Sequence, residues 1–227
     1  MKVENETYAS KFQGKFMKSY KRFIYSLLSC FLILFFTSAC SQGYSYNNKI
    51  PQYTPRITKY SDVPIMGYGK ASPVQLARFF LTYNRNVSNK FIVKFARLYI
   101  QEARKEGVNS DVAFIQMCIE TNFLRFGGQV KPYQNNFAGI GSTDDGAMGA
   151  RFGSVREGIR AQIQHLKAYA SRKPLYNKRV DPRFSYVQRG SAQYVSQLGK
   201  GKWATDPNYA KKIIQKLYRM YRINKIT

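Results

Sequence analysis

The chain has 227 residues, which suits one or two domains and allows a substantial hydrophobic core. Lys and Arg number 37 against 12 Asp and Glu, so we expect attraction to a polyanion: nucleic acid, an anionic membrane surface or the bacterial envelope. Because no zinc-finger spacing, phosphate-binding glycine loop or RNA-binding aromatic pattern accompanies this charge, nucleic acid is not expected as a partner.

The N-terminal part has the pattern of a signal peptide. Residues 18–22 are basic and residues 23–36 are apolar, a run too short to span a membrane as a mature helix. The Thr-Ser-Ala-Cys that follows looks like a lipobox, so Cys40 is expected to be lipidated and to anchor the protein to a membrane, facing the periplasm. Thr37 stands where Leu is usual, which leaves ordinary cleavage and secretion as the alternative. We assign residues 1–40 to this leader.

A tether and a folded domain follow the leader. Residues 41–72 are rich in Ser, Tyr, Asn, Gly and Pro without periodicity and predict a flexible tether, so the domain is expected over residues 73–227. A first helix is predicted from Pro73, with Ser72 as its N-cap, and a second from Ser88 or Asn89 to a stop at Gly107. A third should begin near Asp111, and a fourth after a capping box formed by Ser154 and Glu157. Asp206 should cap a last helix whose first residue is Pro207.

The helix that begins near Asp111 carries one acid close to its end, Glu120. Apolar residues surround it at helical spacing, so the helix should be largely buried. Burial raises the pKa of a carboxylic acid, which makes Glu120 a candidate general acid; the alternative is a solvent-facing or ion-paired carboxylate. Cys118 on this helix is expected to be a buried packing residue. No disulfide is expected within the mature chain, because Cys118 is the only cysteine in the folded part.

A glycine-rich stretch, residues 131–153, follows without helical period and predicts loops with a short β-hairpin. Asp144 and Asp145 lie in it before Gly146, where they would either make a hairpin turn or supply a carboxylate. His165, the only histidine, has no second ligand near it in sequence, so we expect a packing or hydrogen-bonding role and neither a metal nor a cofactor.

Several ordered motifs resemble the glucosaminidase domain of glycoside hydrolase family 73, the bacterial cell-wall N-acetylglucosaminidases. The resemblance covers roughly residues 91–221. It is carried by the apolar helix ending in Glu120 with Phe-Leu-Arg-Phe-Gly-Gly after it, and then in order by NNFAGIG from Asn135, RFGSVREGIRAQIQHLKAYA from Arg151, DPRF from Asp181 and KWATDPNY from Lys202.

This resemblance implies a mainly helical, lysozyme-like α+β fold: one domain with a small β-hairpin beside a groove. It assigns the general acid to Glu120 and a site role to Tyr209, and it implies a second carboxylate on the hairpin, where Asp144 and Asp145 are the only acids. Of these two we prefer Asp145, because it is next to Gly146. A substrate-assisted route would need neither aspartate. Residues expected along the groove are Phe126, Asn136, Phe137, Gly139 and Trp203, the last being either a core anchor or a stacking platform.

The implied function is that of a monomeric hydrolase of the β-1,4 bond after N-acetylglucosamine in peptidoglycan glycan strands. Lytic transglycosylation on the same scaffold is the nearer alternative, in which one Glu serves as acid and base. A non-catalytic, basic, envelope-binding lipoprotein is the alternative from another class.

Overall fold

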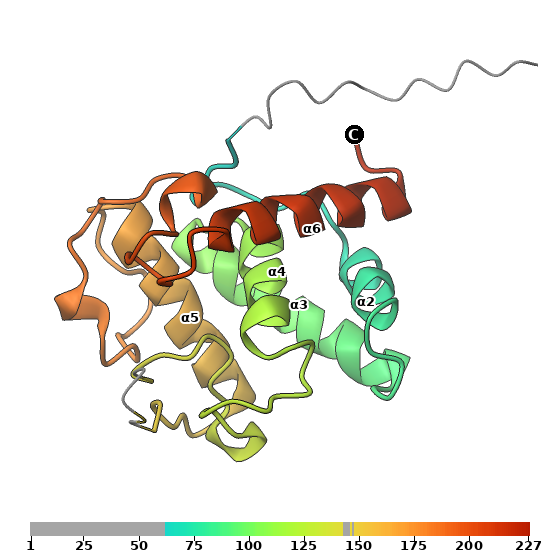
Figure 1. Cartoon of the computed structure of the whole chain (residues 1–227), viewed down its shortest axis with the longest axis horizontal. Helices are drawn as coiled ribbons and strands as arrows, with labels where there is room; N and C mark the ends of the chain where they lie inside the picture. The colour runs from blue at the N-terminus through green and yellow to red at the C-terminus, as the bar shows by residue number, and fades with distance from the viewer. Residues whose placement is uncertain (1–61, 143–145, 147) are drawn as a thin grey trace, which may run out of the picture. The chain divides into compact units, whose positions relative to one another are not determined.

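The computed structural model of the protein describes residues 62–142, 146 and 148–227, and this part is mainly helical (Figure 1). The α-helices in it are α2 (Pro73–Leu81), α3 (Asn89–Glu106), α4 (Ser110–Glu120), α5 (Val155–Ala170) and α6 (Tyr209–Asn224). Short 3₁₀ turns are η1 (Pro132–Gln134), η2 (Phe184–Tyr186) and η3 (Val195–Gln197). None of the helices in the described ranges is both long and apolar enough to cross a bilayer.

The described residues contain no β-strand, only isolated bridges that pair Pro64 with Tyr194 and Met66 with Val108. The turn of the predicted hairpin would fall on residues 143–147, most of which lie outside the described part. The mainly helical character is therefore confirmed, and the hairpin stays a prediction.

Local capping explains where the first two helices begin. Ser72 accepts a hydrogen bond from the Gln75 N–H at the start of α2, and Pro73 occupies the first helical position. Ser88 caps α3, and Gly107 ends it in the left-handed conformation (φ 70°) that glycine adopts without a steric penalty. These boundaries agree with the sequence prediction.

Two predicted caps differ in detail. Ser154 caps α5 as expected, but the carboxylate of Glu157 accepts from the N–H of Gly153, not from that of Ser154. Helix α6 begins at Tyr209, two residues later than predicted. The carboxylate of Asp206 accepts from the Asn208 N–H at 2.8 Å, which folds the preceding residues into a separate turn.

Helix α4 lies at the centre of the core. Its residues from Ser110 to Cys118 are all buried, which fits an apolar helix enclosed on most sides. Figure 1 shows α3, α5 and α6 around it, while α2 packs against α3 and α6. Cys118 is a free, fully buried cysteine, as the sequence predicts. Since α4 ends at Glu120, the central helix delivers this carboxylate to the boundary of the core.

The segment before α2 is part of the fold. Ile65 is fully buried; its N–H donates to the carbonyl of Gln193 at 3.0 Å and its carbonyl accepts from Asn109 at 2.9 Å. Residues 62–72 therefore dock on the domain, and the predicted tether extends too far. Backbone pairing of this kind leaves no signal in composition. Residues 41–61 of the tether lie outside the described part.

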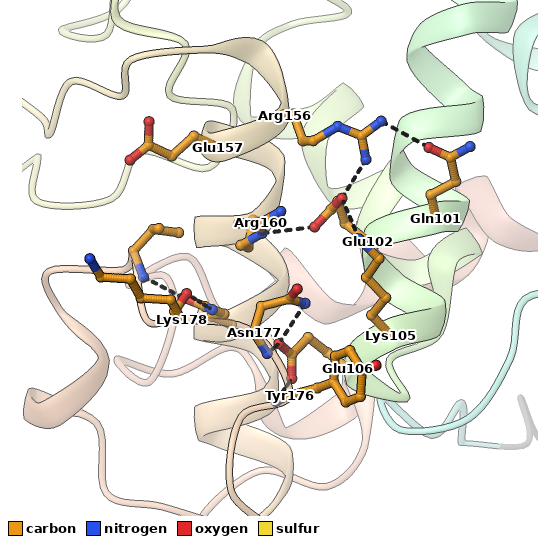
Figure 2. Close-up of polar contacts among 12 residues, drawn as sticks. Gln101, Glu102, Lys105, Glu106, Arg156, Glu157, Arg160, Tyr176, Asn177 and Lys178 are labelled. Carbon is orange, nitrogen blue, oxygen red and sulfur yellow. Dashed lines mark hydrogen bonds and ion pairs between the residues drawn. The ribbon is translucent and has the colours of Figure 1, made fainter.

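Buried glutamates of α3 fix α5 and the loop after it (Figure 2). Glu102, whose side chain is 0% exposed, binds Arg156 at 2.5 Å and Arg160 at 2.8 Å. One turn later, Glu106 binds Lys167 at 2.8 Å and accepts from backbone N–H groups of residues 176 and 177. Each carboxylate is paired and hydrogen-bonded, as burial requires. These contacts set the position of α5 relative to α3.

The chain reverses tightly after α4 through left-handed backbone at Asn122, Phe123, Leu124 and Phe126, with φ between 48° and 59°. Such conformations are costly for residues other than glycine and need support from the surroundings. The Asn84 amide donates to the Phe123 carbonyl at 2.8 Å, and the ring of Phe123 stacks on Tyr83 at 4.2 Å. The loop between α2 and α3 thus holds the turn that follows Glu120.

Candidate active site

Glu120 is held by two donors on one carboxylate oxygen. Its Oε1 accepts from the indole N–H of Trp203 at 3.0 Å and from the hydroxyl of Tyr209. Burial raises the pKa of Glu120 above its ordinary value, because the two hydrogen bonds, which lower it, offset this effect only in part. A carboxyl group in this setting holds its proton to higher pH than an exposed glutamate, which is what a general acid requires.

The geometry also distinguishes the two oxygens of Glu120. An oxygen that already accepts two hydrogens is a poor place for a proton, so the proton of the neutral acid belongs on Oε2. Gly139 lies beside Oε2: a methyl carbon placed on this glycine would be 3.8 Å from that oxygen, and its φ is 65°. The lack of a side chain at Gly139 keeps the space beside Oε2 open.

Two cavities meet at this point. The Glu120 cavity has a volume of about 400 Å³ and is lined by Ile119, Glu120, Asn122, Phe126, Gly128, Gln129, Val130, Gly139 and Ser142. The Trp203 cavity, about 220 Å³, is lined by residues 138–142 together with His165, Tyr169, Arg183, Tyr186, Val187 and Trp203. Because Gly139 and Ser142 line both, the two cavities are neighbours.

Tyr209 stays protonated and therefore acts as a donor. It is buried in the first turn of α6, and burial, together with the nearby carboxylate, raises its pKa well above the ordinary value. The amide nitrogen of Gln116 donates to its oxygen at 3.0 Å. Gln116 precedes Glu120 by one helical turn on α4, so both side chains lie on the same face.

Asn136 and Phe137, predicted to line the groove, point into the interior. The Asn136 amide donates to the carbonyls of Ile140 at 2.9 Å and Ala150 at 3.1 Å, and its oxygen accepts from the Ile140 N–H at 3.0 Å. Phe137 packs edge-on against Phe95, with ring centroids 5.1 Å apart. Neither lines the Glu120 cavity or the Trp203 cavity. Their place is to shape the loop that carries Gly139.

His165 packs against the ring of Trp203. Its Nδ1 pairs with a buried carboxylate oxygen of Asp181 at 2.7 Å, and its ring meets the indole edge-on at 5.0 Å. The hydrogen-bonding and packing role expected for His165 is therefore what the structure shows. Trp203 packs against the core and also lines a cavity, and its role as a stacking platform stays a prediction. Its bond to Glu120 was not foreseen.

Of the predicted site residues, the described part of the chain brings together Glu120, Phe126, Gly139, Trp203 and Tyr209. Asp144, Asp145 and Cys40 lie outside the described residues. No group of three or more His, Cys, Asp or Glu side chains suited to a metal occurs within that part. The roles of Gln116 and Asp181 were not predicted from the sequence. An amide on a mostly apolar helix, one turn before the acid, is the signal that would have identified Gln116.

Comparison with known proteins gives one family and one relative. The model of the glucosaminidase family, described as mannosyl-glycoprotein endo-beta-N-acetylglucosaminidase, matches residues 96–222. A protein of Borreliella burgdorferi (strain ATCC 35210 / DSM 4680 / CIP 102532 / B31), described as an uncharacterized protein, is 38% identical over 199 residues, which are 87% of this chain and 95% of that protein. No solved structure matches.

Proposed function

The chain belongs to the glucosaminidase family, and from this premise we propose that it hydrolyses the β-1,4 bond that follows N-acetylglucosamine in peptidoglycan. The observation that supports this most directly is the state of Glu120. Its pKa is raised by burial, its Oε1 is occupied by two donors, and the carboxyl group lines an open cavity. A glycosidase needs one such acid to protonate the leaving oxygen.

In the proposed reaction, the proton on Oε2 of Glu120 passes to the glycosidic oxygen while the bond from that oxygen to the anomeric carbon breaks. Glu120 becomes a carboxylate at this moment. The donors from Trp203 and Tyr209 already point at Oε1, so they stabilise the negative charge as it forms without reorganisation. Burial thus favours the protonated acid at rest, and the two donors favour the loss of its proton in the transition state.

The positive charge that develops on the anomeric carbon must also be stabilised. Either a carboxylate from Asp144 or Asp145 or the 2-acetamido group of the sugar itself supplies this stabilisation. Water then adds its hydroxyl to the anomeric carbon, and its second proton returns to Glu120. In total, one glycosidic bond is cleaved and one water molecule is consumed, and the strand is left with two new ends.

The glycan strand is proposed to cross both cavities over Gly139, between Phe126 on one side and Trp203 on the other. An aromatic ring can stack on a sugar, and the glycine lets the strand approach the backbone. The excess of basic residues would favour contact with the anionic envelope. We further propose that Cys40 is lipidated and holds the enzyme at a membrane, facing the periplasm.

Mass spectrometry of the products from purified sacculi tests this proposal. A new reducing N-acetylglucosamine end is the expected result. An anhydro-muramic end would instead assign lytic transglycosylation. If no product forms and Glu120→Gln binds sacculi as well as the wild type, the protein is a non-catalytic binder and the hydrolase proposal is wrong.

A further inference from the structure

We propose that a buried chain of hydrogen bonds through Tyr99, Gln162 and Gln116 orients the hydroxyl of Tyr209 toward Glu120 and so keeps the catalytic proton on Oε2. These three are positioning residues, since none of them lines either cavity. The inference rests on the proposed function and adds to it the device that prepares the acid.

The chain runs through four helices in one direction. The Tyr99 hydroxyl on α3 donates to Gln162 Oε1 on α5 at 2.6 Å, and Gln162 Nε2 donates to Gln116 Oε1 on α4 at 2.9 Å. Gln116 Nε2 donates to the Tyr209 oxygen on α6 at 3.0 Å, and the Tyr209 hydroxyl donates to Glu120. Tyr99, Gln162 and Gln116 are 0% exposed, so water cannot replace any partner.

A backbone group fixes this direction. Gln162 Nε2 also donates to the carbonyl of Ala113 at 3.0 Å, and a carbonyl can only accept. The amide of Gln162 therefore cannot be turned around. Its second N–H must face the oxygen of Gln116, which directs the nitrogen of Gln116 at Tyr209. Reversing either amide would bring two donors or two acceptors together in a dry interior.

This arrangement decides where the hydroxyl hydrogen of Tyr209 points. Its oxygen receives the Gln116 N–H, so its single hydrogen is directed at Glu120 Oε1. Without that N–H, the Tyr209 oxygen is free to accept instead, and Glu120 can carry its proton on Oε1, pointing at Tyr209. A proton on Oε1 faces the protein and cannot reach the glycosidic oxygen. The buried chain prevents this unproductive arrangement.

Gln116→Met tests the proposal, because Met fills similar space without a hydrogen-bonding group. We expect kcat on sacculi to fall about tenfold, the usual effect of one lost hydrogen bond, with KM unchanged. The alkaline limb of the pH–kcat profile should move to higher pH, since the neutral acid gains Tyr209 as an acceptor. In a Tyr209→Phe background, Gln116→Met should have little further effect.

The matched control is Asn224→Leu. Asn224 is also a buried amide, and it donates to the carbonyls of Gln75 and Met220 at the far end of α6. This variant should lose stability but keep the wild-type pH profile. If Gln116→Met does not fold, Gln162→Met, which breaks the chain one step earlier, should give the same shift in the alkaline limb.

Two results would overturn the inference but not the proposed function. The first is a folded Gln116→Met or Gln162→Met variant with the wild-type kcat and pH profile. The second is a Gln116→Met effect that is equally large with and without the Tyr209 hydroxyl. Failure of the wild-type protein to cleave sacculi would instead overturn the proposed function, and this inference with it.

Discussion

Glu120→Gln should separate the chemistry of the acid from its structural role. The amide has nearly the shape of the acid, and its oxygen can accept the same two donors, from Trp203 and Tyr209. The fold should therefore be kept. The amide has no acidic proton, so cleavage of sacculi should fall by at least ~10²-fold, the usual contribution of a general acid.

The same variant should change how stability depends on pH. Burial raises the pKa of Glu120 in the folded protein, so the folded state binds this proton more tightly than the unfolded state does. The resulting contribution to stability is fully present below the ordinary pKa of a glutamate and is lost as the pH rises through the raised value. Each unit of pKa difference corresponds to about 1.4 kcal/mol. Gln does not titrate, so the variant should gain stability relative to the wild type as the pH increases.

Thermal unfolding at a series of pH values, beside sacculus digestion, measures both effects. Glu157→Gln is the control, since Glu157 accepts from Gly153 at the start of α5 and lines neither cavity. Near-normal digestion by folded Glu120→Gln would refute the assignment of the acid. A difference in melting temperature that stays constant from acid to alkaline pH would refute the argument about its burial.

Lys167→Met should destabilise the fold by roughly 3 kcal/mol in denaturant unfolding, because it leaves the carboxylate of Glu106 buried without its cation; an unchanged midpoint would show that the backbone donors suffice. Cys40→Ser should abolish incorporation of labelled fatty acid and release the protein from membranes, whereas a wild type that carries no lipid would favour ordinary secretion. If one aspartate of the glycine-rich loop stabilises the cation, either Asp144→Asn or Asp145→Asn should lose much of the rate and the other little. Activity retained in the double variant, with inhibition by a thiazoline, would indicate the substrate-assisted route.

Helix boundaries were predictable where a local cap decides them. Ser72 with Pro73 and Ser88 with Gly107 mark α2 and α3 in the sequence and in the structure. The start of α6 was predicted wrongly, since the bond from the Asn208 N–H to Asp206 that shapes the preceding turn leaves no unambiguous trace in the sequence.

The candidate site was predictable only where single residues carry the chemistry. Glu120 and Tyr209 follow from their motifs, and the structure places them in contact. The inward direction of Asn136 depends on the path of a loop, which periodicity does not describe. The link from Gln162 to Gln116 depends on how helices far apart in sequence pack together, so no local pattern contains it.

The left-handed turn after α4 bears on which residues a fragment of this protein must contain to keep the site supported. The family match begins at residue 96, yet the turn that follows Glu120 is held by Asn84, and α2 packs against both α3 and α6. The part of the chain that packs around the site therefore begins before the segment that the family model matches. A fragment cut at residue 96 would carry Glu120 and its two donors, but neither Asn84 nor α2, which support the turn and the helices behind them.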